Sequence, residues 1–181
     1  MTALTLDQAS TIVDEALEKG RELKLQPLTV VVLDAGGQLK AMKREDRSSL
    51  LRPEIAMGKA WGTLGMGFGG REFARRVAAG GTAFIQALTV ASGGRIVPVP
   101  GGVLIRDAAG EIIGSVGISG DTSDKDEACA VHGIGAAGLS PDTGAECAPK
   151  ALGVVAELGV REDLLGVQAF EVGSSRLDLL L

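Results

Sequence analysis

Apolar residues recur along the chain at spacings that predict one long helix and two hairpins. At the start of the chain, apolar side chains return every three or four residues, which predicts an amphipathic helix over about residues 6–24. Two later segments, 28–44 and 103–118, each contain two extended apolar runs joined by a glycine-containing turn. This arrangement is typical of a β-hairpin, so these segments are expected to supply four strands.

Further helices are expected between and after the hairpins. Pro53 suits the first turn of a helix, and the Ser123-x-x-Asp126 pattern matches the capping box that opens one. The expected helices cover about residues 53–64, 72–79, 82–91, 124–137 and 150–158. Residues 139–149 are expected to form a loop and 167–172 a last strand. Together these elements predict an α+β fold, with an antiparallel β-sheet of about five strands flanked by α-helices.

Composition argues against nucleic acid and membrane partners. Aromatic residues make up 3% of the chain and the formal net charge is −5, whereas nucleic-acid-binding proteins offer basic surfaces and aromatic faces. No run of 18 apolar residues is present, which argues against a membrane-spanning helix. The first residues lack the basic and apolar regions of a signal peptide, so a cytoplasmic protein is expected.

Glycine is unusually frequent, at 27 of 181 residues against roughly 7% in an average protein. Two groups of small residues flank the second predicted hairpin: Gly101, Gly102, Gly117, Ser119 and Gly120. Backbone N–H groups at such positions can approach a small or flat ligand closely. Ordinary turn geometry is the alternative explanation of these glycines.

Several charged side chains are candidates for ligand binding or catalysis. Lys59, on the helix after Pro53, can hold a carboxylate as a point charge, and Arg44 and Arg95 are secondary candidates. Asp126 and Glu127 begin a predicted helix. The helix dipole alone favours carboxylates there, but one of them can instead serve as an acid or base.

The single histidine is a weak candidate for a metal ligand. His132 lies three residues after Cys129 on a predicted helix, with Glu146 and Cys147 later in the chain. Structural zinc needs four ligands, usually at tighter spacing, so no metal site is expected. His132 is chemically able to ligate haem iron, although an ordinary helix histidine is the favoured interpretation. Trp61, the single tryptophan, can form the wall of a pocket, although a place in the core is the favoured interpretation.

Five stretches of the chain match, in order, the motifs of a known family. They are Val30-Val-Val-Leu-Asp34-Ala-Gly-Gly37 with Leu39, Lys43-Arg44-Glu45-Asp46, Ala56-Met-Gly-Lys59-Ala60, Val99-Pro-Gly-Gly102-Val-Leu-Ile105, and Ile113-Gly-Ser-Val-Gly117-Ile-Ser-Gly120 followed by Asp126-Glu127. Over residues 5–137 the chain resembles the GlcG/HbpS/PduO C-terminal family of haem-binding or haem-degrading domain proteins. Leu104 stands where the family has a proline after the double glycine.

The resemblance implies a GlcG-like fold with profilin-like layers and a small-molecule ligand. That ligand is haem or another tetrapyrrole, with a corrinoid less favoured, and the implied binding residues are Lys59, Arg44 and the glycine groups. A homo-oligomer is also implied, and the apolar tail at 177–181 agrees with one. Residues 1–138 correspond to the family domain. Residues 139–181 form an extension expected to pack on that domain or at an oligomer interface.

Two other functions remain open from the sequence. One is a tautomerase, isomerase or decarboxylase that acts on a small oxo-acid and uses Lys59 with Asp126 or Glu127. The other is a purely structural or regulatory oligomer. The sequence does not decide between binding and turnover.

Overall fold

Thr5 sets the start of the first helix. Its hydroxyl accepts the backbone N–H of Gln8 at 3.1 Å, and the Gln8 side chain accepts the Thr5 N–H at 3.1 Å, which completes a capping box. The helix α1 (Leu6–Glu22) begins where the sequence predicts it, in a computed structural model that describes residues 3–145. The other elements are β1 (Thr29–Asp34), β2 (Leu39–Arg44), α2 (Arg52–Met66), α3 (Gly70–Ala78), α4 (Thr82–Ala91), β3 (Gly102–Arg106), β4 (Ile112–Ser119), α5 (Ser123–Ala136) and β5 (Ser140–Asp142).

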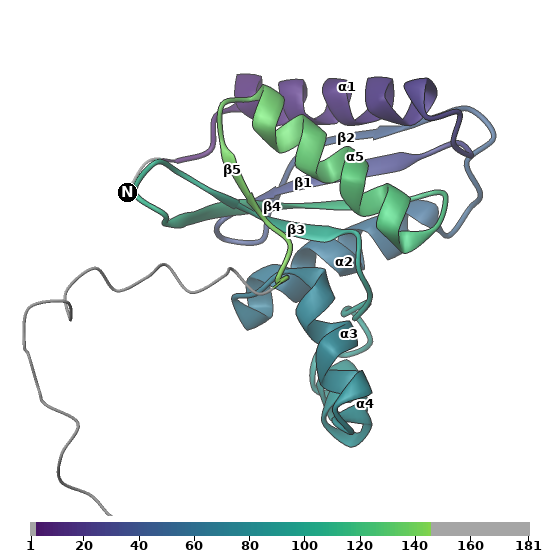
Figure 1. The fold of residues 1–181 in the computed structure, drawn as a ribbon, viewed down its shortest axis with the longest axis vertical. Helices are drawn as coiled ribbons and strands as arrows, with labels where there is room; N and C mark the ends of the chain where they lie inside the picture. The colour runs from purple at the N-terminus through teal and green to yellow at the C-terminus, as the bar shows by residue number, and fades with distance from the viewer. Residues whose placement is uncertain (1–2, 146–181) are drawn as a thin grey trace, which may run out of the picture. The chain divides into compact units, whose positions relative to one another are not determined.

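The five strands form one antiparallel sheet in the order β2-β1-β4-β3-β5 (Figure 1). Both predicted hairpins are present, as the pairs β1–β2 and β3–β4. The two hairpins join through β1 and β4, where Thr29 pairs with Ser119. The predicted α+β fold, with an antiparallel sheet of about five strands, is therefore confirmed.

The fifth strand lies where the sequence predicts a loop. Residues 140–142 pair with β3, and the Asp142 carboxylate accepts a hydrogen bond from Arg106 at 2.8 Å. An edge strand tolerates proline, so the two prolines of 139–149 do not exclude a short strand at Pro141. The helix and the strand expected over 150–158 and 167–172 lie outside the described residues.

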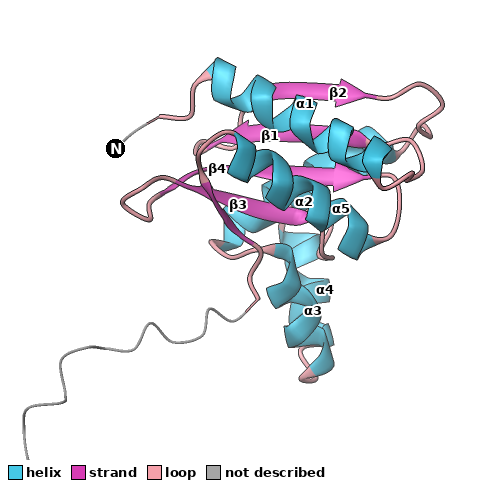
Figure 2. Ribbon diagram, turned by 45° about the horizontal axis from the view of Figure 1, so that its top comes forward, coloured by secondary structure: helices cyan, strands magenta, loops and turns pink. Residues whose placement is uncertain are grey.

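Helices cover both faces of the sheet. α1 and α5 lie on one face and α2 lies on the other (Figures 1 and 2). On β1, Val30 and Val32 join the core under α1 and α5, whereas Val31 and Leu33 join a smaller core under α2. α3 and α4 extend away from the sheet on the α2 side (Figure 1). Within residues 3–145, no helix is long and apolar enough to cross a membrane.

A glycine on β4 lets α2 approach the sheet closely. A methyl group on Gly117 would overlap the carbonyl oxygen of Ala56 on the helix. On the same strand, the Ser115 hydroxyl donates to the carbonyl of Ala60 at 2.9 Å. The backbone of the helix therefore lies directly against the backbone of the strand, and α2 holds its side chains in fixed places.

The start of α5 differs from the sequence prediction. The N-cap is Thr122, which makes no capping hydrogen bond through its side chain, so the predicted Ser123–Asp126 capping box is wrong. The Asp126 carboxylate instead accepts hydrogen bonds from the backbone N–H of Asp121 at 3.1 Å and from the ammonium of Lys59 on α2. The Asp126 side chain is therefore used in a long-range ion pair and not in a local cap of α5, and the local sequence pattern does not reveal this.

Candidate functional site

Lys59 and Asp126 form a buried ion pair between α2 and α5. The Lys59 Nζ lies 2.9 Å from Asp126 Oδ2, and the two side chains are 3% and 1% exposed. Burial raises the pKa of Asp126, and the neighbouring Lys59 ammonium offsets this only in part. Of the two carboxylates that the sequence offers as partners of Lys59, the structure pairs it with Asp126. It also shows that the charge of Lys59 is already balanced inside the fold.

Gly101 is shaped to this ion pair. Its φ angle of 99° lies in the left-handed region, and a Cβ there would come within 2.7 Å of the Lys59 Nζ. Gly102 lies against the same helix, because its Cβ would come within 2.6 Å of the Lys59 carbonyl oxygen. The double glycine is therefore explained by its contacts with Lys59.

The other small residues of the predicted ligand site also make internal contacts. Gly117 lies against α2, and a Cβ on Gly120 would come within 2.6 Å of the Pro27 carbonyl oxygen. Ser119 is buried, and its hydroxyl accepts a hydrogen bond from Arg52 at 3.1 Å. Close approach of the main chain accounts for Gly117 and Gly120, and the hydrogen bond with Arg52 accounts for Ser119.

Glu127 links α5 to α3 rather than joining Lys59. Its Oε1 accepts a hydrogen bond from Arg71 Nε at 2.7 Å, and Arg71 also contacts Asp124 at 3.0 Å. Within the described part of the chain, Glu127 Oε2 is buried without a hydrogen-bond partner. Burial raises the pKa of Glu127. The two carboxylates of the Asp126-Glu127 motif therefore serve different contacts.

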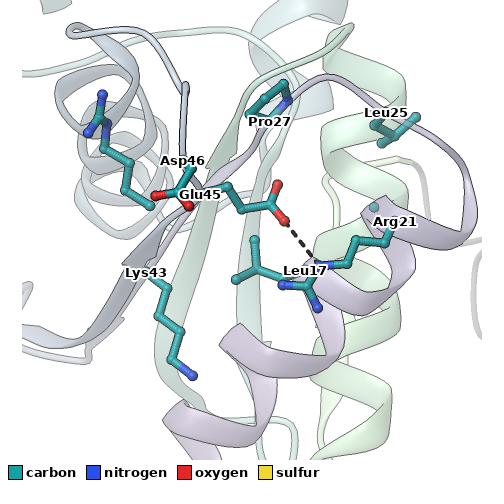
Figure 3. Close-up of a pocket in the computed structure, with 9 residues that line it drawn as sticks. Leu17, Arg21, Leu25, Pro27, Lys43, Glu45 and Asp46 are labelled. Carbon is teal, nitrogen blue, oxygen red and sulfur yellow. Dashed lines mark hydrogen bonds and ion pairs between the residues drawn. The ribbon is translucent and has the colours of Figure 1, made fainter.

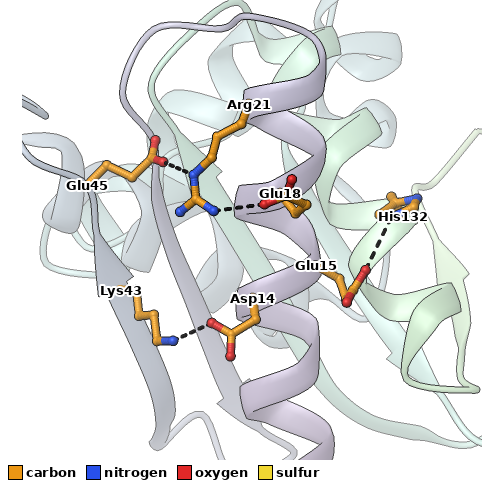
Figure 4. Close-up of polar contacts among 7 residues, drawn as sticks. All are labelled: Asp14, Glu15, Glu18, Arg21, Lys43, Glu45 and His132. Atoms are coloured by element: carbon orange, nitrogen blue, oxygen red, sulfur yellow. Dashed lines mark hydrogen bonds and ion pairs between the residues drawn. The ribbon is translucent and has the colours of Figure 1, made fainter.

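Cys129 and His132 do not form a metal-binding pair. Cys129 is fully buried in the core under α1, and burial raises the pKa of its thiol to about 11. His132 is 41% exposed and lies 3.7 Å from Glu15 on α1 (Figure 4). Glu146 and Cys147 lie outside the described residues. Among residues 3–145, no group of three potential His, Cys, Asp or Glu ligands could hold a metal ion.

A first cleft, here called the α1 cleft, lies between the end of α1 and the end of β2 (Figure 3). It has a volume of about 680 Å³. Its lining residues are Leu17, Gly20, Arg21, Leu25, Pro27, Lys43, Arg44, Glu45 and Asp46. Arg44, predicted as a ligand residue, is exposed here and donates to the Ser48 carbonyl.

Two of the three cations of the α1 cleft, Arg21 and Lys43, are already paired with carboxylates. Arg21 contacts Glu45 at 3.2 Å and Glu18 at 3.0 Å, and Lys43 contacts Asp14 (Figure 4). The second oxygen of Glu45 accepts the backbone N–H of Leu28 at 2.8 Å. A carboxylated ligand would have to compete with these internal partners.

A second cleft, here called the Trp61 cleft, lies between α2 and the segment 94–97. It has a volume of about 560 Å³, and its apolar lining includes Leu51, Ile55, Met57, Trp61 and Val97. The Arg95 guanidinium lies over the Trp61 ring, with Cζ 3.9 Å from the ring centroid. Polar groups at the cleft are few: Gln38, Glu54 and Arg95.

The sequence contains part of the signal for the Trp61 cleft. Met57 and Trp61 are four residues apart on α2, a spacing that places both on one helix face. The opposite wall comes from residues more than thirty positions later. It is held by a hydrogen bond from the Val97 N–H to the Gly58 carbonyl, at 3.2 Å. Only the fold could show that Arg95 covers Trp61.

Comparisons with known proteins agree with this architecture. The structure is similar to that of a PduOC–haem complex, with 27% identity, a TM-score of 0.69, and coverage of 77% of this chain and 98% of that chain. It is similar to an HbpS double mutant from Streptomyces reticuli, with 26% identity, a TM-score of 0.63, and coverage of 75% and 87%. Its fold also matches Klebsiella pneumoniae protein ORFY, with 24% identity, a TM-score of 0.68, and coverage of 76% and 93%.

The search of curated proteins found no significant match. A family model described as haem degrading protein HbpS-like matches residues 4–135, which is most of the chain. The fold, the order of the motifs and this match agree. The chain belongs to the HbpS-like family.

Proposed function

We propose that the protein binds haem or another tetrapyrrole in the Trp61 cleft. The observation that carries this proposal is an apolar cleft of about 560 Å³ with an aromatic wall and, among residues 3–145, one cation in its lining, Arg95. Small-molecule sites typically have volumes of roughly 300–1,000 Å³, apolar linings and a few polar groups that fix orientation. A flat macrocycle with polar groups on its edge matches this arrangement.

The family supports a haem-related ligand. The matching family model is described as haem-degrading, and the similar PduOC structure is a haem complex. A corrinoid is the less favoured alternative. The α1 cleft is a poorer candidate, because Arg21 and Lys43 are paired with carboxylates of the same chain.

An oxo-acid enzyme built on Lys59 has less support. Lys59 and Asp126 are almost completely buried and pair with each other, and neither lines the α1 cleft or the Trp61 cleft. We therefore propose no reaction through this pair, and we place ligand binding in the Trp61 cleft instead.

A homo-oligomer stays a prediction. On α4, Phe84 and Val90 are 47% and 80% exposed, which agrees with a surface that a second copy covers. The expected absence of nucleic acid and membrane partners and the cytoplasmic location also stay predictions.

The test is a titration with hemin, followed by absorption in the Soret region. The wild-type protein is expected to bind hemin saturably, near one equivalent per chain. Ile55→Glu places a charge in the Trp61 cleft and should weaken binding by about tenfold or more, because the ligand cannot stabilise a desolvated charge. Leu25→Glu, at a half-buried position of the α1 cleft, is the matched control and should keep the affinity.

Circular dichroism checks that both variants fold. Absence of saturable binding by the wild type would overturn the proposed function. Loss of binding in folded Leu25→Glu, with binding kept in Ile55→Glu, would move the site to the α1 cleft.

A further inference from the structure

We infer that Arg95 selects ligands that carry a carboxylate on the edge of an apolar, planar ring system, and that it leaves Trp61 to do so. This inference rests on the proposed function, since it concerns the ligand class of the same cleft. It names Arg95 as the group that recognises the ligand and gives a chemical basis on which the cleft distinguishes one tetrapyrrole from another.

The guanidinium of Arg95 has no carboxylate partner within residues 3–145. Its contacts are the face of Trp61 and a hydrogen bond from Nε to the Ser92 carbonyl at 3.2 Å. By contrast, the arginines of α3 and of the β3–β5 pair all contact carboxylates: Arg71, Arg75, Arg76 and Arg106. Arg95 is thus the cation of the Trp61 cleft that a ligand carboxylate can engage without displacing an internal ion pair.

A carboxylate competes well for this guanidinium. A cation–π contact at an exposed site is weak, whereas an arginine fork can donate two parallel, charge-assisted hydrogen bonds to one carboxylate. Arg95 is exposed, so its side chain can turn from the ring toward the mouth of the cleft. The same movement uncovers the face of Trp61, which then becomes available to an apolar ring of the ligand.

The backbone around Arg95 permits a side-chain movement without a loop movement. Ile96 donates its N–H to Ser92 Oγ at 3.3 Å, and the Val97 N–H donates to the Gly58 carbonyl at 3.2 Å. These two hydrogen bonds fix the backbone of Ile96 and Val97, which follow Arg95 in the segment 94–97 beside the cleft. Gly94, which also lines the cleft, has no side chain that would obstruct the turning guanidinium.

Glu54 influences how a carboxylated ligand is oriented in the Trp61 cleft. It lies in the first turn of α2 and lines the same cleft, where its charge repels a ligand carboxylate. A carboxylated ligand is therefore oriented with its acidic edge toward Arg95 and away from Glu54. Porphyrins of the haem type carry ionised propionates on one edge, whereas the edge of a cobalamin corrin carries neutral amides. The geometry therefore favours a porphyrin dicarboxylate over a corrinoid.

The experiment compares metal-free deuteroporphyrin IX with its dimethyl ester, which removes both carboxylates and keeps the ring. Because neither probe contains iron, axial ligation cannot contribute to the difference. Each probe is titrated into the wild type, Arg95→Ala, Arg95→Lys and the control Arg21→Ala, which removes a cation from the α1 cleft. Porphyrin fluorescence reports binding. The emission of Trp61, the single tryptophan, reports the uncovering of its ring in the free variants.

The wild type and Arg21→Ala should bind the acid at least tenfold more tightly than the ester. Arg95→Ala should lose this preference by binding the acid as weakly as the ester, and the Trp61 emission of the free variant should change. Arg95→Lys should keep only part of the preference, because an ammonium cannot form the two-pronged contact.

Three outcomes count against the inference and separate it from the proposed function. A wild type that binds both probes equally overturns the inference alone. An Arg95→Ala variant that keeps the preference for the acid also overturns it alone. A wild type that binds neither porphyrin nor hemin overturns the proposed function and the inference together.

Discussion

The helices on the two faces of the sheet are held by different kinds of contact. Under α1 and α5, seventeen buried residues form one continuous apolar core, whereas four form the corresponding cluster under α2 in the described part of the chain. The α2 face is held instead by backbone contact through Gly117, by the hydrogen bond of Ser115 and by the pair of Lys59 with Asp126. The first face therefore stabilises the fold mainly by burying apolar side chains. On the second face, specific contacts fix the position of α2 relative to the sheet.

This difference explains why the better candidate site lies beside α2. Side chains fill the α1 face, and two cations of its cleft, Arg21 and Lys43, are paired with carboxylates of the same chain. On the α2 face, the helix lies close to the sheet, so one side of it is left to line the Trp61 cleft. The face with the smaller apolar core is thus the one that borders the Trp61 cleft.

The largest expected change in stability comes from adding a methyl group between β4 and α2. Gly117→Ala should destabilise the protein by about 5 kcal/mol or more, since the new methyl group would overlap the main-chain oxygen of Ala56 and α2 would have to move. Urea unfolding measures the change. Gly135→Ala on α5 is the matched control, because a Cβ there meets nothing within 4 Å. It should stabilise by about 0.5–1 kcal/mol, as alanine is the better helix former. Similar stability of both variants would contradict this account of the α2 face.

Breaking the buried ion pair should have the next largest effect. Lys59→Ala leaves Asp126 buried without its partner, which should cost about 3–5 kcal/mol at pH 8. Arg21→Ala, which removes the ion pairs of an exposed arginine with Glu18 and Glu45, should cost less than about 1 kcal/mol. Because Lys59 does not line the Trp61 cleft, folded Lys59→Ala should keep its affinity for hemin.

The loss in Lys59→Ala should depend on pH. Burial already raises the pKa of Asp126, and removal of the lysine raises it further. A raised pKa of a folded-state carboxyl gives stability that is present below the unfolded value of about 3.9 and is lost as pH rises through the folded value. The destabilisation measured by urea unfolding should therefore be small near pH 4 and grow toward pH 8. Equal destabilisation at both pH values would count against a charged, unpartnered Asp126 as its cause.

The smallest effect is expected at His132. The side chain is 41% exposed and lies on the α1 face, away from the residues that line the Trp61 cleft. His132→Ala should change stability by less than about 0.5 kcal/mol, the usual range for a surface position. The absorption spectrum of the hemin complex should persist. A shifted Soret band in the folded variant would show that His132 ligates the iron and would place the haem on the other face.

Local patterns predicted most of the elements, and long-range contacts account for what they missed. Hydrophobic spacing is a property of neighbouring residues, so it predicted α1 and both hairpins. The sequence offers both Asp126 and Glu127 as partners of Lys59. It cannot choose between them, because 67 positions separate Lys59 from Asp126 and their pairing depends on how α2 and α5 pack across the sheet. The glycines are predicted as places of close approach, yet only the fold shows that α2 approaches Gly102 and Gly117 and that Pro27 approaches Gly120.

The two edge strands of the sheet affect whether sheets of different molecules can join at high protein concentration. Strand β2 forms one edge and presents Lys40, Lys43 and Arg44, while the opposite edge in residues 3–145 is the three-residue strand β5 with Pro141 at its centre. Positive charge, shortness and proline each discourage another strand from adding to an open edge. Growth of the sheet from molecule to molecule is thereby disfavoured at both edges of the sheet that residues 3–145 form.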